Sequence, residues 1–303
     1  MNSEQRIKNL SVPKRKIDVV LDTDAYNEID DQFAIAYLLK SKEKLNTLAL
    51  YAAPFYNNNS SGSADGMEKS YDEILKLLKL AGEERPVFKG ADRYLPDEKT
   101  PVVSAAALDL AQKAREYSPE NPLYVVAIGA ITNIASAILL EPAVAENTVV
   151  VWLGGHALHY HDTAEFNMKQ DIAAARVVMG SGVPFVQLPC MGVVSAFSVS
   201  KQELEYWFSG KTPLSDYLSY NTINEAESYA HGRAWTRVIW DVTAIAWLLN
   251  EENRFMHSRI IGTSLPDYDC KYETENPNNP MCYVYNIKRD ELLNDLICKI
   301  ISE

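Results

Sequence analysis

Four aspartates lie between positions 22 and 31 and are the residues of this chain best placed to do chemistry. Asp22 and Asp24 end a short β-branched run, whereas Asp30 and Asp31 begin an Ala/Leu/Tyr-rich run that is typical of a helix. Carboxylates this close stay ionised only if a positive charge joins them, and a hard cation such as calcium prefers oxygen ligands. The pattern therefore predicts a metal site. The alternative, helix capping by one aspartate, leaves three carboxylates unexplained.

Three histidines, His156, His159 and His161, form a second candidate cluster. Their spacing matches no standard structural zinc site, and no cysteine lies nearby in the sequence. We therefore favour pocket lining or hydrogen bonding over zinc binding for these residues.

Strands and helices alternate along the chain, as expected for βαβ units. After the first strand and helix, strands are predicted at residues 47–53, 86–90, 123–129, 148–153 and 184–189. Helices are predicted at about 66–80, 104–117, 134–140, 172–179, 201–208, 214–229 and 242–249. We predict an α/β fold, a single domain over residues 1–303 with an open, mostly parallel, Rossmann-like sheet and helices on both faces.

The periodic pattern weakens after residue 260. We therefore expect a core at about 17–262 and a C-terminal extension at about 263–303. Within the extension, residues 266–280 are predicted to form a loop, residues 283–287 an edge strand, and residues 291–301 a closing helix.

Composition restricts the classes of partner. The chain has 303 residues, 47% of them hydrophobic, and a formal net charge of −12. This charge argues against nucleic acid as a partner, because phosphate binding needs clustered Lys and Arg. We expect a soluble, cytoplasmic protein with no membrane partner, because the N-terminus is polar and no apolar run reaches about 18 residues. The four scattered cysteines indicate free thiols.

Ligands of open α/β sheets bind beyond the carboxyl ends of the strands, which here are followed by polar loops. Five motifs in these loops, in this order, resemble those of the nucleoside hydrolase family. They are Asp22-Thr23-Asp24 with Asp30-Asp31, Gly129-Ala130-Ile131-Thr132-Asn133, Gly154-Gly155, Ala164-Glu165-Phe166-Asn167, and Asp241 before a helix. The resemblance covers residues 22 to about 249.

This resemblance implies hydrolysis of the N-glycosidic bond of a ribonucleoside, which releases base and ribose, with a bound calcium ion. The implied metal ligands are Asp24, Asp31, Asp241 and the main-chain carbonyl of Ile128. Asp24 would also be the general base that activates water. Ribose hydroxyls would be bound by Asp30, Glu165 and Asn167. Family members are usually dimers or tetramers, so a homodimer or homotetramer is expected.

The sequence also departs from the family pattern. The loop between Asp24 and Asp30 is two residues longer than usual, so Asp22 is the alternative general base. The asparagine expected to hold the ribose 5′-hydroxyl aligns with His159, which is therefore a predicted substrate contact. The asparagine expected after the second strand is missing, unless one of residues 57–59 replaces it.

A tryptophan, Trp240, stands where many members of the family carry a histidine that protonates the leaving base. This tryptophan resembles the purine-specific branch, in which aromatic rings sandwich the base. We therefore expect stacking on Trp240 to favour purines, with Tyr94, Tyr160 or Trp235 as the second aromatic wall; the alternative is that Trp240 belongs to the core.

The leading prediction is a calcium-dependent, purine-leaning ribonucleoside hydrolase. Two alternatives are an N-ribosyl hydrolase of a modified or non-nucleoside riboside, and a catalytically inactive nucleoside- or sugar-binding protein. A phosphatase of the haloacid dehalogenase type is disfavoured because Tyr26 occupies the position where that motif needs Thr or Val. The segment 220–235 is either a lid over the pocket or an ordinary surface helix.

Overall fold

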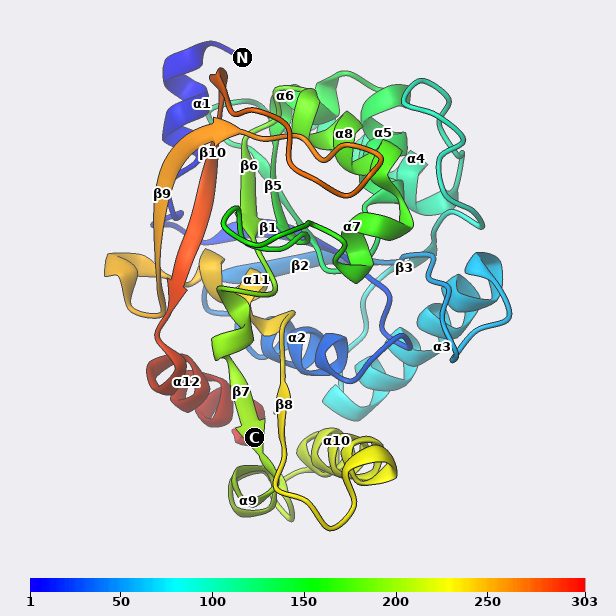
Figure 1. The fold of residues 1–303 in the computed structure, drawn as a ribbon, viewed down its shortest axis with the longest axis vertical. Coiled ribbons are helices and arrows are strands. Elements are labelled where there is room, and N and C mark those ends of the chain that lie inside the picture. Colours follow the sequence, from blue (N-terminus) through cyan, green and yellow to red (C-terminus); the bar gives the residue numbers. More distant parts are fainter. Residues whose placement is uncertain (303) are drawn as a thin grey trace.

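An eight-stranded sheet of order β3-β2-β1-β4-β5-β6-β10-β9 forms the centre of the computed structural model, which describes residues 1–302 (Figure 1). Its strands are β1 (Ile17–Thr23), β2 (Leu45–Ala52), β3 (Val87–Lys89), β4 (Leu123–Ala127), β5 (Thr148–Leu153), β6 (Phe185–Leu188), β9 (Met256–Thr263) and β10 (Asn276–Ile287). Every neighbouring pair is parallel except β9 and β10. The predicted mostly parallel α/β architecture is confirmed.

Helices cover both faces of this sheet. One face carries α2 (Asp30–Leu39), α3 (Ser63–Ala81), α11 (Val242–Leu248) and α12 (Arg289–Ile301). The other carries α4 (Ala105–Ala114), α5 (Thr132–Leu140), α6 (Ala143–Asn147) and α8 (Ile172–Gly180). Along β1, Val19 and Leu21 belong to the first core and Val20 to the second, because successive strand residues point to opposite faces. The short helix α7 (Phe166–Gln170) contributes Met168 to the second core, and α1 (Ser3–Asn9) precedes β1.

No helix within residues 1–302 is both long enough and apolar enough to cross a bilayer.

The prediction that residues 283–287 form an edge strand is wrong. They end the longer strand β10, which lies inside the sheet between β6 and β9. The Asn and Pro residues at the start of β10 make this part of the sequence look like a loop. The strand at this edge of the sheet is β9, whose middle residues are exposed. The segment after residue 263 therefore adds a strand to the central sheet, and its last helix, α12, packs against α2.

A small lobe extends from the main body at the bottom of Figure 1. It contains an antiparallel pair that the sequence did not predict, β7 (Ser198–Ser200) and β8 (Thr236–Val238). Between these strands lie α9 (Lys201–Glu203), a π-helix (Leu204–Phe208) and α10 (Pro213–Ala230). Because β8 leads directly to Trp240 and Asp241, this lobe fixes where the chain re-enters the main body.

Candidate active site

Three buried aspartates from opposite ends of the sequence meet at the carboxyl ends of the central strands. Asp30 and Asp31 form the first turn of α2, and Asp241 directly precedes α11. One carboxylate oxygen from each of the three lies within 4.8 Å of the others. The contact between α2 and α11 on one face of the sheet therefore brings the early acidic motif to the late aspartate.

Asp24 follows the end of β1 and is fully buried. Within residues 1–302, neither of its carboxylate oxygens has a hydrogen-bond partner. Asp22 differs, because its Oδ1 accepts a hydrogen bond of 2.8 Å from Asn133 Nδ2 on α5. Asp31 is also engaged, since it accepts a hydrogen bond from the Thr23 hydroxyl. Asp22 Oδ2 is also buried without a partner in the described part of the chain, so Asp24 differs from Asp22 in that both of its oxygens, not one, are free.

Burial raises the pKa of each carboxyl in this cluster above its ordinary value. For Asp31 the pKa rises to about 7, although the hydrogen bond from Thr23 opposes the shift. The pKa values of Asp24, Asp30 and Asp241 are raised well above the ordinary range, first by burial and then by the neighbouring carboxylates. A positive charge among them would reverse this effect, because it favours the ionised forms.

The donor set fits a hard divalent cation. A buried carboxylate oxygen without a hydrogen-bond partner lowers the stability of the fold, and among the described residues Asp24 has two such oxygens. Carboxylates and main-chain carbonyls are the oxygen ligands that calcium takes. Asp30, Asp31 and Asp241 are the side chains whose oxygens lie close enough together to hold such an ion, and the predicted ligand Asp24 is buried outside that group of three. Ile128, whose carbonyl is the fourth predicted ligand, lines the adjacent cavity.

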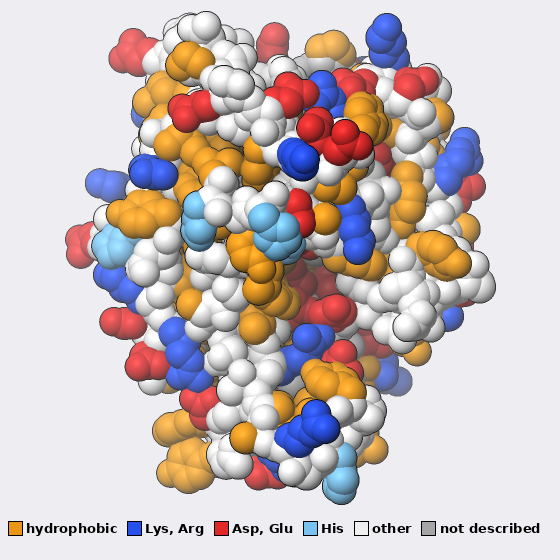
Figure 2. Space-filling model, viewed as in Figure 1, with side chains coloured by type: hydrophobic (Ala, Val, Ile, Leu, Met, Phe, Trp, Pro, Cys, Tyr) orange, Lys and Arg blue, Asp and Glu red, His pale blue; other side chains and the backbone are white. Residues whose placement is uncertain are grey.

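A cavity opens beside this cluster. Its lining residues are Asn27, Glu28, Asp30, Ile128, Leu153, His156, Ala164, Glu165, Phe166, Asn167, Cys190, Met191, Trp240 and Asp241. Figure 2 shows acidic side chains at the bottom of a hollow near the middle of this face, with histidines beside it. Of the predicted substrate contacts, Asp30, Glu165, Asn167 and Trp240 line the cavity. The predicted metal ligands Ile128 and Asp241 also line it, whereas Asp24 and Asp31 are buried and do not.

Glu165 and Asn167 form hydrogen bonds between the loop after β5 and the carboxyl ends of β4 and β5. Glu165 caps α7 by accepting hydrogen bonds from the backbone N–H groups of Asn167 and Met168, and it also accepts from Gly155. The Asn167 amide donates to the carbonyls of Ile128 and Leu153, both at 3.1 Å. Burial raises the pKa of Glu165, and the three backbone donors oppose that shift. These two side chains therefore shape the cavity wall between β4 and β5.

The structure does not place His159 in the cavity, which corrects the prediction that it contacts substrate. The chain turns after Ala157, whose carbonyl accepts a 2.8 Å hydrogen bond from the Tyr160 N–H. This turn leaves His159 exposed, whereas His156 lines the cavity and accepts from the Met191 N–H at 3.4 Å. Within residues 1–302 the histidines form no ligand cluster of the kind that the aspartates form.

The aromatic wall also differs from the expected one. Tyr94, Tyr160 and Trp235 are absent from the residues that line the cavity, and Phe166 lines it together with Trp240. Phe166 stands between Glu165 and Asn167, so its position inside that motif was the signal that could have identified it.

The family profile of inosine-uridine preferring nucleoside hydrolases matches residues 19–291 of the chain. The chain belongs to this family. It is therefore a nucleoside hydrolase, whose reaction is the hydrolysis of the N-glycosidic bond of a ribonucleoside.

Relatives of this nucleoside hydrolase differ in the specificity that their names state. The pyrimidine-specific ribonucleoside hydrolase RihA of Citrobacter koseri is 25% identical over 264 residues, which are 78% of this chain and 80% of that protein. Among solved structures, a plant nucleoside hydrolase, PpNRh1, has a TM-score of 0.75 at 20% identity and covers 95% of this chain and 100% of its own. A purine-preferring ribonucleoside hydrolase from Gardnerella vaginalis has a TM-score of 0.75 at 19% identity, covering 94% and 98%.

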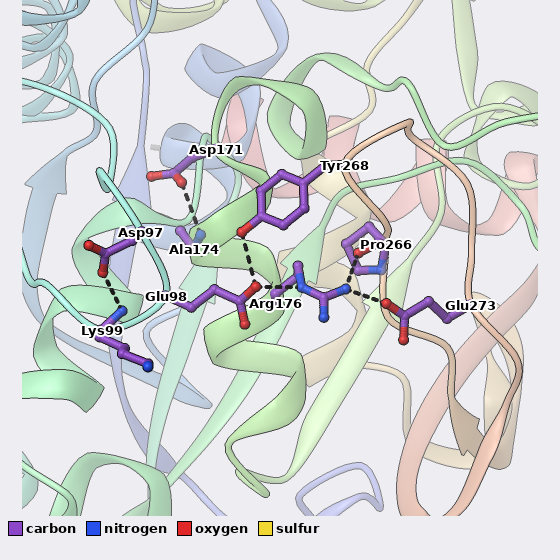
Figure 3. A network of polar contacts seen from close by, with 9 residues as sticks. All are labelled: Asp97, Glu98, Lys99, Asp171, Ala174, Arg176, Pro266, Tyr268 and Glu273. Carbon is purple, nitrogen blue, oxygen red and sulfur yellow. Dashed lines mark hydrogen bonds and ion pairs between the residues drawn. The ribbon is translucent and has the colours of Figure 1, made fainter.

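The C-terminal loop of this nucleoside hydrolase braces the active-site loops. Figure 3 shows Arg176 of α8 bonded to Glu98, to the Pro266 carbonyl and to Glu273, at 2.7, 2.7 and 2.5 Å. From the same loop, the Tyr272 hydroxyl donates to the His156 carbonyl at 2.9 Å. A residue C-terminal to the five family motifs therefore helps to hold the loop that carries His156 in place.

Gly129 leaves the room that Asp24 needs. A Cβ at position 129 would lie 3.0 Å from Asp24 Cγ and 3.2 Å from the Ala53 Cβ. We expect Gly129→Ala to displace the Asp24 carboxylate. Because Asp24 is the predicted general base, kcat should fall by about tenfold or more. Overpacking should also lower the free energy of unfolding by about 1–3 kcal/mol. Steady-state kinetics and denaturant unfolding measure the two effects. Gly62→Ala, where a Cβ meets nothing within 4 Å, is the control.

Proposed function

We propose that this nucleoside hydrolase depends on calcium and prefers purine ribonucleosides. The observation that carries the proposal is a cavity lined both by Trp240 and Phe166 and by Asp30 and Asp241 of the buried acidic cluster. Such a site offers carboxylates for a ribose and a cation, and aromatic surface for a base.

Asp24, Asp31, Asp241 and the Ile128 carbonyl would hold the cation. When bound, calcium supplies positive charge that keeps these carboxylates ionised and lowers the pKa of water. Asp24 would be the general base, since its oxygens have no other hydrogen-bond partner within residues 1–302. Asp30, Glu165 and Asn167 would bind ribose hydroxyls from the cavity wall.

Carboxylates also suit the transition state of this reaction. Cleavage of the bond between sugar and nitrogen develops positive charge on the ribose ring as the base departs. Ionised Asp30 and Glu165 in the cavity wall would stabilise that charge more than the neutral ground state, which lowers the barrier. Their fixed positions matter here: Glu165 is held by three backbone N–H groups.

The base would stack on Trp240. An indole does not donate a proton usefully at neutral pH, so stacking rather than direct protonation would assist departure of the base. A purine presents more ring area to such a surface than a pyrimidine does. His156 is one of the cavity residues that could form a hydrogen bond with the base. Burial lowers its pKa, so that it is mostly neutral near pH 7.

Trp240→Ala tests the purine preference. Because base stacking contributes about 1–3 kcal/mol, we expect kcat/KM for inosine, adenosine and guanosine to fall by about fivefold to 150-fold. The loss for uridine and cytidine should be smaller. Release of reducing sugar from these five ribonucleosides and from one modified riboside measures both the preference and its loss.

Trp235→Ala is the matched control. Trp235 is also a partly buried tryptophan of the same segment, but its Nε1 donates to Glu227 at 3.1 Å and it does not line the cavity. Unchanged purine turnover in Trp240→Ala, or equal losses in the two variants, would show that Trp240 does not form the base site.

A further inference from the structure

Glu28 is a cavity residue that the proposed reaction does not use. It belongs to the lengthened loop between Asp24 and Asp30, and its side chain is 40% exposed. One of its carboxylate oxygens accepts a 2.6 Å hydrogen bond from Arg237. Its carboxylate also contributes to the raised pKa values of Asp24, Asp30 and Asp31, so it lies close enough to these three aspartates to act on them electrostatically.

Arg237 fixes Glu28 but does not fully neutralise it. The guanidinium lies on β8, is 17% exposed, and pairs with Glu225 of α10 at 3.1 Å as well as with Glu28. One positive charge is therefore shared between two carboxylates, which leaves the group of Glu28, Arg237 and Glu225 with a net negative charge. Glu28 is the member of that group that faces the cavity.

The other charged residues of the cavity wall are acidic too. They are Asp30, Glu165 and Asp241, and within residues 1–302 no Lys or Arg lines the cavity. Asp30 and Asp241 belong to the cluster whose charge a divalent cation would offset, and Glu165 is bonded to three backbone N–H groups. Within the same residues, Glu28 has neither of these partners, and it shares the single charge of Arg237 with Glu225. An anionic group that enters the cavity therefore meets a carboxylate whose charge is only partly neutralised.

We propose that Glu28, held in place by Arg237, makes the cavity reject anionic ribosides such as nucleoside 5′-phosphates and admit neutral ribosides. This specificity role rests on the proposed nucleoside site. A carboxylate repels a phosphate through space, and partial burial strengthens the repulsion because it weakens screening by solvent. The same carboxylate can accept a hydrogen bond from a neutral hydroxyl, so neutral substrates are not penalised.

Glu28→Gln tests the role with little change of shape. For the wild type, kcat/KM should be far higher for inosine than for inosine 5′-monophosphate. In Glu28→Gln this ratio should fall by about tenfold or more, mainly through a lower KM for the monophosphate, because one repelling charge is removed. A ratio within about twofold of the wild-type value in Glu28→Gln overturns the proposal.

Two further variants separate charge from loosening of the loop. Glu225→Gln removes a charge from the same guanidinium but outside the cavity wall, so it should lower the ratio by clearly less than Glu28→Gln does. Equal falls in the two variants would overturn the role of Glu28 as the cavity residue that repels anions. Arg237→Met removes the neutralising charge, so it should raise the ratio rather than lower it. A fall in Arg237→Met equal to that in Glu28→Gln would identify loop disorder as the cause and overturn the role of charge.

Binding measurements keep this test independent of turnover. If the wild type hydrolyses no ribonucleoside, the proposed substrate fails, but the affinities of ribose and ribose 5-phosphate measured by calorimetry still test Glu28. Tighter binding of ribose than of ribose 5-phosphate, with the gap reduced in Glu28→Gln, supports the role. Equal affinities of the wild type for the two sugars count against it. Thermal unfolding of each variant establishes that it is folded.

Discussion

Replacement of Asp24 by asparagine is expected to lower kcat for ribonucleoside hydrolysis by about 10²- to 10⁴-fold, the range for loss of a general base. The substitution keeps the size of the side chain but removes a charge and the capacity to accept a proton. Asp24 is the natural target because both of its buried oxygens lack a hydrogen-bond partner within residues 1–302. Steady-state release of reducing sugar at saturating calcium and substrate measures the loss.

Asp22→Asn is the matched comparison, since it makes the same change two residues earlier. Asp22 already accepts a hydrogen bond from Asn133 through Oδ1, and burial raises its pKa to about 7. Its replacement should therefore reduce kcat much less than Asp24→Asn. The reverse order of effects would assign the general base to Asp22, the alternative that the longer loop leaves open.

The early part of the acidic cluster could be predicted from sequence because its geometry is local. A strand that ends near Asp24 and a helix that begins at Asp30 are both visible in the residue pattern, and the structure has β1 ending at Thr23 and α2 beginning at Asp30. The approach of Asp241 is different, since it depends on how α11 packs against α2. No local sequence pattern predicts that contact. The grouping of Asp241 with Asp24 and Asp31 was predicted only from the resemblance to the nucleoside hydrolase family.

Features that depend on loop conformation were not predictable. His159 and His156 are three residues apart in one loop, and the turn at Ala157 determines which of them faces the cavity. The place of β10 within the sheet was hidden because its first residues, rich in Asn and Pro, look like a loop. Glu28 could not be assigned to the cavity because a charged residue in a loop is most often solvated.

Removal of divalent cations is expected to abolish hydrolysis and to lower the melting temperature, and added calcium should restore both. The buried carboxylates repel one another in the absence of a positive charge, and burial raises their pKa values. Calcium at about 100 times its dissociation constant stabilises a protein by about 2.7 kcal/mol. For a chain of this size that corresponds to a rise in melting temperature of about 5 °C. Dialysis against a chelator, followed by thermal unfolding and activity assays with calcium or magnesium, provides the measurement.

Asp241→Asn distinguishes this site from calcium bound elsewhere. Without one carboxylate of the cluster, the calcium-dependent rise in melting temperature should largely disappear. In chelator, the same variant should unfold at the same temperature as the wild type or higher, because one of the mutually repelling buried carboxyl groups has been removed. A calcium effect of equal size in the wild type and in Asp241→Asn would place the ion outside this cluster. Full activity after chelation would show that the carboxylates act without a metal.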